Sequence, residues 1–172
     1  MLAVTLWIFE EGLLMERGAE LSAVPYEQVV DFQANRETGR PMFWLTLKDD
    51  VQIVLSVGNT PEIMPVMEYI EIRMAAAQLL PRLRSIWHGK AEEFGVLVLN
   101  RGGIEGPGFF APWPEVRRVV DDGTTVFIDS ADAPKWLDVH YRRVSFPSLV
   151  MAISHVLIEE HSRLAPTFEP EA

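Results

Sequence analysis

An internal repeat constrains this 172-residue chain more than any other feature of its sequence. Residues 6–30 and 96–116 share an alternating apolar pattern, then a polar turn that holds a glycine, then an apolar residue two positions after that glycine. We align Gly12 with Gly102 on this basis. A repeat of this kind predicts a chain built from two similar halves.

A proline followed by an aromatic residue forms the second anchor of the repeat. Pro25-Tyr26 matches Pro112-Trp113, after a loop that is three residues shorter in the second copy. Proline cannot donate a hydrogen bond to a neighbouring strand, so it favours the start of a strand, and the aromatic residue then enters the core. The preceding glycine supplies the positive φ that a tight hairpin turn needs. Each half is therefore predicted to open with a hairpin and a third strand.

Two more strands follow in each half. In the first half, residues 42–47 and 51–57 are apolar runs separated by the turn Lys48-Asp49-Asp50. In the second half, residues 124–128 and 136–141 are separated by a longer loop. Runs of this length and composition bounded by turn residues predict strands, so each half holds about five of them.

A helical pattern closes each half. Apolar residues recur at 3.6-residue spacing from about 61 to 86, after the start signal Asn59-Thr60-Pro61-Glu62, and again from about 147 to 163. Pro81 is predicted to end the first helix or to bend it. The order of strands then helix predicts an α+β fold.

This order resembles the pleckstrin-homology-like (PH-like) fold, a bent antiparallel sheet closed by a C-terminal helix. The resemblance rests on the turn glycines, the two proline-aromatic pairs, Phe94-Gly95 at the start of the second copy, and the paired helices, and it covers about residues 3–163. The chain looks similar to a family of bacterial PH-like proteins of unknown function. One departure is that the family fold has seven strands in each unit.

The resemblance implies two PH-like repeats in one chain. The first half spans residues 1–90 and the second spans 91–164, while residues 165–172 are expected to form a flexible tail. It also implies a binding scaffold rather than an active site, because PH-like folds mostly recognise lipid headgroups or proteins.

The charge of the chain argues against anionic partners. The net charge is -10, so nucleic acid and anionic membranes are repelled on average. Phosphoinositide binding needs cationic donors around the first hairpin, but the two matching turns, Glu10-Glu11-Gly12 and Asn100-Arg101-Gly102, hold one arginine between them. We therefore expect no nucleic-acid partner and no phosphoinositide membrane binding.

The cellular setting is predicted from what the sequence lacks. There is no cysteine, which excludes disulfides, thiolate zinc sites and cysteine nucleophiles. The apolar N-terminus lacks the basic region of a signal peptide, and no apolar run is long enough to span a membrane. We expect a soluble, cytoplasmic protein.

No set of side chains predicts catalysis, a metal or a cofactor. His155 and Glu159 have the i, i+4 spacing of two metal ligands, but a third ligand is missing. Asp138 could orient His140, yet no serine or threonine nucleophile stands in a recognisable motif nearby. The glycine-rich run 102–108 leads into a strand rather than a helix, so it is a hairpin and not a phosphate loop.

The strongest binding candidates lie in the second half. Phe109 and Phe110 follow a glycine-proline-glycine turn, where the strand pattern cannot bury both rings, and an exposed ring would mark a binding surface. Arg101, in the turn that matches the first hairpin, and Trp136, at the start of the last strand, complete the predicted binding residues.

These observations predict a non-enzymatic interaction module whose acidic surface binds a protein partner, itself basic if charge guides the contact. One alternative is an immunity protein that covers the active site of a basic toxin. Others are a PH-like domain that binds a lipid or small ligand, a homodimer joined through open sheet edges, and a histidine-dependent hydrolase that uses His140 or His155.

Overall fold

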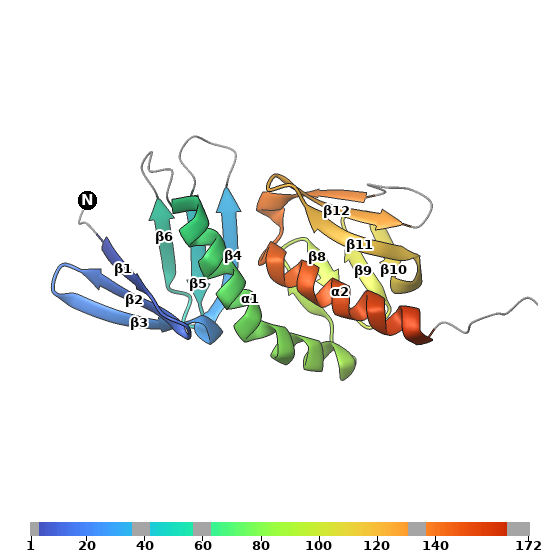
Figure 1. Ribbon diagram of the computed structural model, residues 1–172, viewed down its shortest axis with the longest axis horizontal. Helices are drawn as coiled ribbons and strands as arrows, with labels where there is room; N and C mark the ends of the chain where they lie inside the picture. The colour runs from blue at the N-terminus through green and yellow to red at the C-terminus, as the bar shows by residue number, and fades with distance from the viewer. Residues whose placement is uncertain (1–3, 36–41, 57–62, 131–136, 165–172) are drawn as a thin grey trace, which may run out of the picture.

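The computed structural model describes residues 4–35, 42–56, 63–130 and 137–164. Within them the chain forms four small antiparallel sheets and two helices, and the second helix is the last element (Figure 1). The predicted α+β class is therefore confirmed. Strand order within each sheet follows chain order, because every connection between neighbouring strands is a turn or loop rather than a crossover.

The first half holds two sheets and a long helix. Its elements are β1 (Val4–Ile8), β2 (Gly12–Arg17), β3 (Glu20–Pro25), the one-turn 3-10 helix η1 (Tyr26–Gln28), β4 (Val29–Asn35), β5 (Met42–Leu47), β6 (Gln52–Ser56) and α1 (Ile63–Trp87). β1, β2 and β3 form one sheet, and β4, β5 and β6 form another.

The second half repeats this order with one additional strand. Its elements are β7 (Glu92–Phe94), β8 (Leu97–Leu99), β9 (Gly103–Gly106), β10 (Phe109–Pro112), η2 (Trp113–Glu115), β11 (Val116–Asp121), β12 (Thr125–Ser130), β13 (Leu137–His140), η3 (Tyr141–Arg143) and α2 (Pro147–Leu164). The described residues thus hold six strands in the first half and seven in the second, where about five in each were predicted. Short strands such as β7 were missed because three residues carry too little periodicity.

The two proline-aromatic pairs end strands, although the sequence predicted that they start them. Pro25 is the last residue of β3 and Pro112 is the last residue of β10. Each proline has extended backbone angles, and a 3-10 turn begins at the following aromatic residue. The prediction that the aromatic residues enter the core is confirmed, since Tyr26 and Trp113 are 0% and 1% exposed.

The same side-chain hydrogen bond fixes both aromatic residues. The Tyr26 hydroxyl donates to the carbonyl oxygen of Phe9 at 3.1 Å. The Trp113 Nε1–H donates to the carbonyl oxygen of Asn100 at 2.8 Å. Phe9 lies between β1 and β2, and Asn100 lies between β8 and β9. In each half, the hydrogen bond therefore connects the aromatic residue that follows the last strand of a sheet to an earlier turn of the same sheet.

The hydrogen bonds correct the alignment of the repeat by one residue. The Phe9 N–H donates to the Gly12 carbonyl, and the Asn100 N–H donates to the Gly103 carbonyl. Gly103, not Gly102, therefore occupies the position of Gly12. None of the three is among the described glycines with positive φ, so the turn role that the sequence predicted for Gly12 and Gly102 is wrong.

These glycines are required for close packing between strands. A Cβ on Gly12 would lie 2.5 Å from the carbonyl oxygen of Val24, and one on Gly103 would lie 2.3 Å from that of Ala111. Contacts of this length are far inside van der Waals distance. Any side chain at either position would push the strand opposite it away.

The helix α1 runs through Pro81 and ends at Trp87. Pro81 does not end the helix, although it lacks the N–H that would donate to the carbonyl four residues earlier. Leu83 and Ile86, in the last turns, are buried in the core, which stabilises the helix beyond the proline. Within the described residues, neither α1 nor α2 is long and apolar enough to cross a membrane.

Both halves contribute to one hydrophobic core. Phe146, just before α2, reaches into the first half, where its N–H donates to the Phe32 carbonyl at 2.9 Å and its ring centroid lies 6.1 Å from that of Phe32. Phe146 has a φ of 48°, a left-handed conformation that costs about 1–2 kcal/mol outside glycine. Burial of its ring offsets this cost. The division into units at 1–90 and 91–164 stays a prediction.

Candidate functional site

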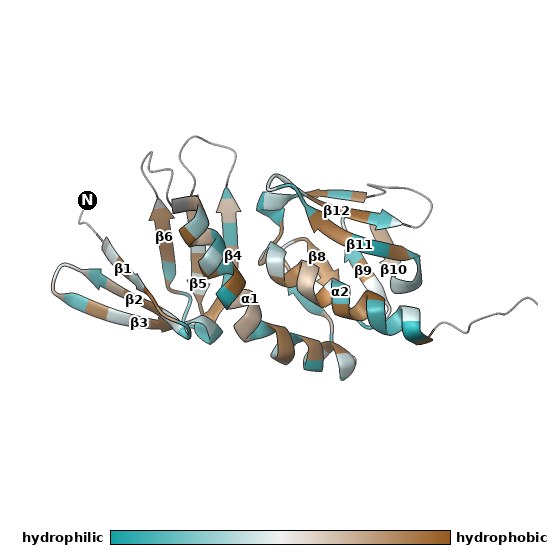
Figure 2. Cartoon of the chain, viewed as in Figure 1, coloured by the Kyte–Doolittle hydropathy of each residue, from teal (hydrophilic) through white to brown (hydrophobic). Residues whose placement is uncertain are grey.

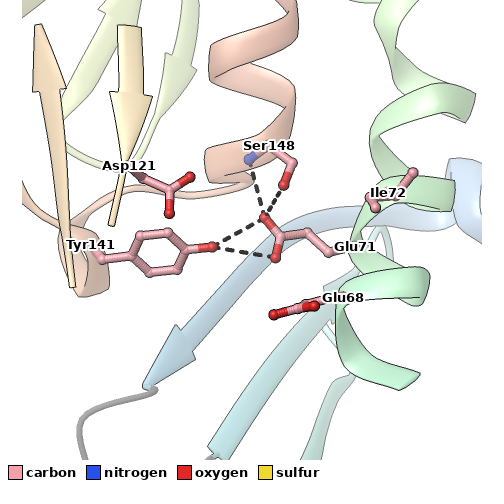
Figure 3. Close-up of a pocket in the computed structure, with 6 residues that line it drawn as sticks. All are labelled: Glu68, Glu71, Ile72, Asp121, Tyr141 and Ser148. Carbon is pink, nitrogen blue, oxygen red and sulfur yellow. Dashed lines mark hydrogen bonds between the residues drawn. The ribbon is translucent and has the colours of Figure 1, made fainter. Parts of the chain in front are cut away.

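A pocket of about 200 Å³ lies where the two halves meet (Figure 3). Four elements line it, and Figure 3 shows their side chains converging from α1 on one side and from the second half on the other. The lining residues are Glu68, Glu71 and Ile72 of α1, Asp121 of β11, Tyr141 of η3 and Ser148 of α2.

Glu71 forms the floor of this junction pocket and is only 1% exposed. Its Oε1 accepts hydrogen bonds from the Ser148 N–H at 3.1 Å and from the Ser148 hydroxyl at 2.7 Å. The Tyr141 hydroxyl lies 3.2 Å from Oε1 and 3.3 Å from Oε2 of the same carboxylate, and donates to it. A buried carboxylate on the first half therefore accepts hydrogen bonds from two residues of the second half.

The position of Ser148 explains why a carboxylate is placed there. Ser148 is the second residue of α2, and the first N–H groups of a helix have no partner within the helix. These groups also carry the positive end of the helix dipole, which favours an anion. Glu71 thus caps the start of α2 from a different helix, and this contact holds the two halves together.

The other two carboxylates of the junction pocket are more accessible. Glu68 is exposed, and Asp121 is half-buried with Oδ1 accepting the Gly123 N–H at 2.8 Å. These two acids and Glu71 give the pocket an acidic lining. Among the described residues, no three His, Asp or Glu side chains are arranged to hold a metal ion.

A second groove, of about 320 Å³, lies on the first half beside Pro81. Val29, Val30 and Gln78 line it together with the charged residues Glu27, Lys48 and Arg82. The Gln78 amide donates to the Val29 carbonyl at 2.7 Å, so this amide is used to fix α1 against the turn before β4. The lining of the groove is therefore part apolar and part charged, and Arg82 is paired with Glu92.

The predicted binding residues Phe109, Phe110 and Arg101 do not line the junction pocket. Phe110 is 51% exposed, and its ring covers Gly103, where a Cβ would lie 2.8 Å from a ring atom. Phe109 is half-buried on the opposite face of β10, over Gly106. The sequence expectation that one ring of the pair is exposed is therefore met by Phe110.

Arg101 lies in the β8–β9 turn, next to the glycines that Phe110 covers. Its carbonyl oxygen accepts a hydrogen bond from His161 Nε2 at 3.1 Å, which connects this turn to the end of α2. The structure thus brings Arg101 and Phe110 to one end of the second half and places Phe109 on the other face. Trp136 lies outside the described residues.

The histidines that the sequence singled out take part in surface contacts. His155 Nε2 lies 3.3 Å from Glu159 on the exposed side of α2, and Glu159 also pairs with Arg163 at 3.2 Å. His140 Nδ1 accepts the Arg142 N–H at 3.3 Å at the start of η3. The His140 contact fixes the local backbone, and the His155 contact joins two side chains on the surface of α2.

Sequence reasoning missed the junction pocket. Glu71 lies between Ile70 and Met74 in a stripe of buried apolar residues on α1, and a charged residue in such a stripe is a signal for a buried partner. The partners of Glu71 could not be found from this pattern, because Tyr141 and Ser148 lie 70 and 77 positions away from it along the chain.

No protein-family model matches this chain, and neither a curated protein nor a solved structure is found to be similar to it.

Proposed function

We propose that this chain is a non-enzymatic interaction module, made of two PH-like repeats, that binds a basic protein partner through the acidic junction pocket. The observation that carries the proposal is the acidic lining of this pocket, to which Glu68, Glu71 and Asp121 each contribute a carboxylate. The net charge of -10 adds attraction for a basic partner at longer range.

Two features support the PH-like part of the proposal. Each half runs from strands to a closing helix, and each ties its hairpin with an equivalent hydrogen bond from Tyr26 or Trp113. The seven strands of the second half equal the number in a PH-like unit.

The hydrogen bonds made by Ser148 and Glu71 favour a binding role over catalysis. The Ser148 hydroxyl lies beside a carboxylate of the junction pocket, but Ser148 is at a helix start where its hydroxyl and N–H both donate to Glu71. A nucleophile needs a base that is free to take its proton, and this carboxylate is already engaged by Tyr141.

Affinity purification of the tagged protein from its native cell tests the proposal. We expect one stoichiometric basic partner with the unaltered chain and its loss with E68Q/D121N, which removes two charges and leaves Glu71 in place. The matched control is E93Q/E105Q, which removes two charges from exposed positions on β7 and β9.

Retention of the partner by E68Q/D121N, or capture of an acidic partner, would exclude the junction pocket as the binding site. If the partner is toxic when expressed alone, the module is an immunity protein. If no partner is captured, the interaction proposal fails and a small ligand in the groove beside Pro81 becomes the next candidate.

A further inference from the structure

The outer edge of β1 is open, whereas the matching edge in the second half is covered by a strand. β8 is the counterpart of β1, because the turns that follow them are closed in the same way by the N–H groups of Phe9 and Asn100. β8 lies between β9 and β7, while β1 pairs, among the described residues, with β2 alone (Figure 1). The second half therefore shows that this edge of the fold accepts an antiparallel strand.

The backbone groups at the open edge belong to Leu6 and Ile8. Successive residues of an antiparallel strand present their N–H and C=O groups to opposite neighbours. The Phe9 N–H donates to the carbonyl of Gly12 in β2. Trp7, two positions before Phe9, therefore also faces β2, and the N–H and C=O groups of Leu6 and Ile8 face away from it.

The residues that match Leu6 and Ile8 in the second half are Leu97 and Leu99. Both pair with residues of β7. Both are also 0% exposed, whereas Leu6 and Ile8 are only partly buried. The covering strand thus coincides with complete burial of these two positions.

The edge of β1 has none of the features that usually protect an open edge, such as a charged residue, a proline or a bulge. Its sequence is Val-Thr-Leu-Trp-Ile, and its register with β2 is regular. β3, the opposite edge of the same sheet, begins at Glu20 and ends at Pro25. β6 is also uncharged, but its counterpart β13 has an open edge too among the described strands. The second half therefore indicates a covering strand for β1 and not for β6.

The open edge also carries exposed aromatic side chains. Trp7 and Phe9 are 41% and 55% exposed. They lie on the same face of the strand because they are two positions apart. A strand added to this edge would cover part of both rings, which favours its binding.

We infer that two copies of this chain pair through the open edges of β1, antiparallel and across a two-fold axis. In this arrangement Leu6 of each copy exchanges backbone hydrogen bonds with Ile8 of the other, and the two Trp7 side chains lie opposite each other. A register that pairs Leu6 with itself would instead place Trp7 opposite Thr5 and cover less aromatic surface. The inference is independent of the proposed function, because no residue of β1 is part of the described lining of the junction pocket.

The sequence of β1 favours a second copy as the occupant. A two-fold pairing satisfies the open backbone groups of both chains at once, and each copy supplies the uncharged strand that the other lacks. The net charge of -10 opposes association, but β1 itself carries no charge, and Glu10 in the following turn is paired with Arg73 at 3.0 Å. Charges farther from the contact than about 8 Å are largely screened at physiological salt.

Sedimentation equilibrium of the full chain tests the inference. One strand pair buries less area than a standard interface, so we expect a dimer with a dissociation constant of about 10–100 μM. Added salt should tighten it by screening the net charge. W7K should weaken the dimer at least about ten-fold, because it places like charges opposite each other. A mixture of W7K and W7E should restore association.

The matched control is L21K, which adds the same charge on the same face of the sheet but on β3. Leu21 is 65% exposed, so the change leaves the core intact. L21K should dimerise as the unaltered chain does. Thermal unfolding of each variant establishes that it is folded before association is measured.

Oxidative cross-linking tests the register. The chain has no cysteine, so W7C carries a single thiol and any disulfide joins two copies. Directly opposed residues of a non-hydrogen-bonded pair have Cα atoms about 4.5 Å apart, which lies within disulfide range. W7C should therefore form a covalent dimer, and L21C should stay monomeric.

Three results would overturn the inference. The first is an unaltered chain that stays monomeric up to about 1 mM. The second is equal loss of the dimer with W7K and L21K. The third is a dimer that W7K leaves intact and W7C does not cross-link, which would place the contact on another surface.

Discussion

The two helices of this protein each follow the last strand of their half, yet their outer surfaces differ in kind. The exposed residues of α2 before its last one are polar, namely His155, Glu159, Ser162 and Arg163. The side of α1 that faces away from the core instead carries the exposed apolar residues Tyr69, Ile72 and Leu80, and we call it the outer face of α1. In Figure 2 teal segments gather toward the end of α2, while much of the later part of α1 is brown.

This difference shows that similar local structure does not fix the surface that a half presents. The hairpins of the two halves share the aromatic hydrogen bond and the close glycine contact. These features depend on neighbours within about twenty residues. The outer surface depends on what each helix contacts. A polar face such as that of α2 is well solvated by water, whereas the outer face of α1 leaves apolar surface in water, which is unfavourable.

The largest expected effect comes from comparing Glu71, which is buried on α1, with Glu159, which is exposed on α2. Replacing Glu71 by Ala removes the carboxylate that accepts from the Ser148 N–H and the Tyr141 hydroxyl, so we expect a loss of about 3 kcal/mol in the free energy of unfolding. Urea denaturation measures it. The matched change Glu159→Ala removes only exposed ion pairs and should cost about 0.5 kcal/mol or less.

Glu71→Gln keeps one acceptor oxygen and should recover part of that loss. Equal stability of the Glu71→Ala and Glu159→Ala variants would mean that the carboxylate does not hold the two halves together.

A smaller effect tests whether the two hairpins are equivalent. Gly12→Ala and Gly103→Ala each place a methyl group within 2.5 Å of a carbonyl oxygen on the neighbouring strand, so each should cost about 2 kcal/mol. Thermal unfolding measures both. Gly102→Ala is the control, because a Cβ there meets only the Asn100 side chain at 3.3 Å and the Phe110 ring at 3.8 Å.

If Gly102→Ala proves as costly as Gly103→Ala, the original alignment of Gly12 with Gly102 would be restored.

The smallest effect distinguishes the two buried aromatic residues by pH. Burial is the main reason that the pKa of Tyr26 is raised above its usual 10.0, and Tyr69 raises it further while Arg73 lowers it. Above pH 10.0 the unfolded chain releases this proton more readily than the folded chain, so stability falls as the pH rises through and beyond that value. The decline is at most about 1.4 kcal/mol per pH unit for one group.

Thermal unfolding between neutral and alkaline pH checks this prediction. Tyr26→Phe should show a shallower alkaline decline than the unaltered chain, because the titrating hydroxyl is gone. Trp113→Phe should leave the decline unchanged, since the indole does not titrate there. A Tyr26→Phe variant with the same alkaline decline would assign the effect to other groups.

Much of the local structure could be predicted from the sequence. The strand patterns, the two helices, the α+β class and the burial of Tyr26 and Trp113 depend on periodicity and on residue types over short stretches. Pro25 was predicted to start a strand but ends β3. Proline has no N–H to donate, and this property is equally compatible with the first and the last residue of a strand.

The junction was decided by the tertiary structure alone. Glu71 and Ser148 are 77 positions apart, and no periodicity connects a carboxylate on one helix to the start of another. Likewise, the buried and outer faces of α1 are both apolar in the sequence, and only the packed core shows which one is left in water. Local patterns determine which elements form, because their physics acts over a few residues, whereas contacts between distant elements depend on how the chain closes around one core.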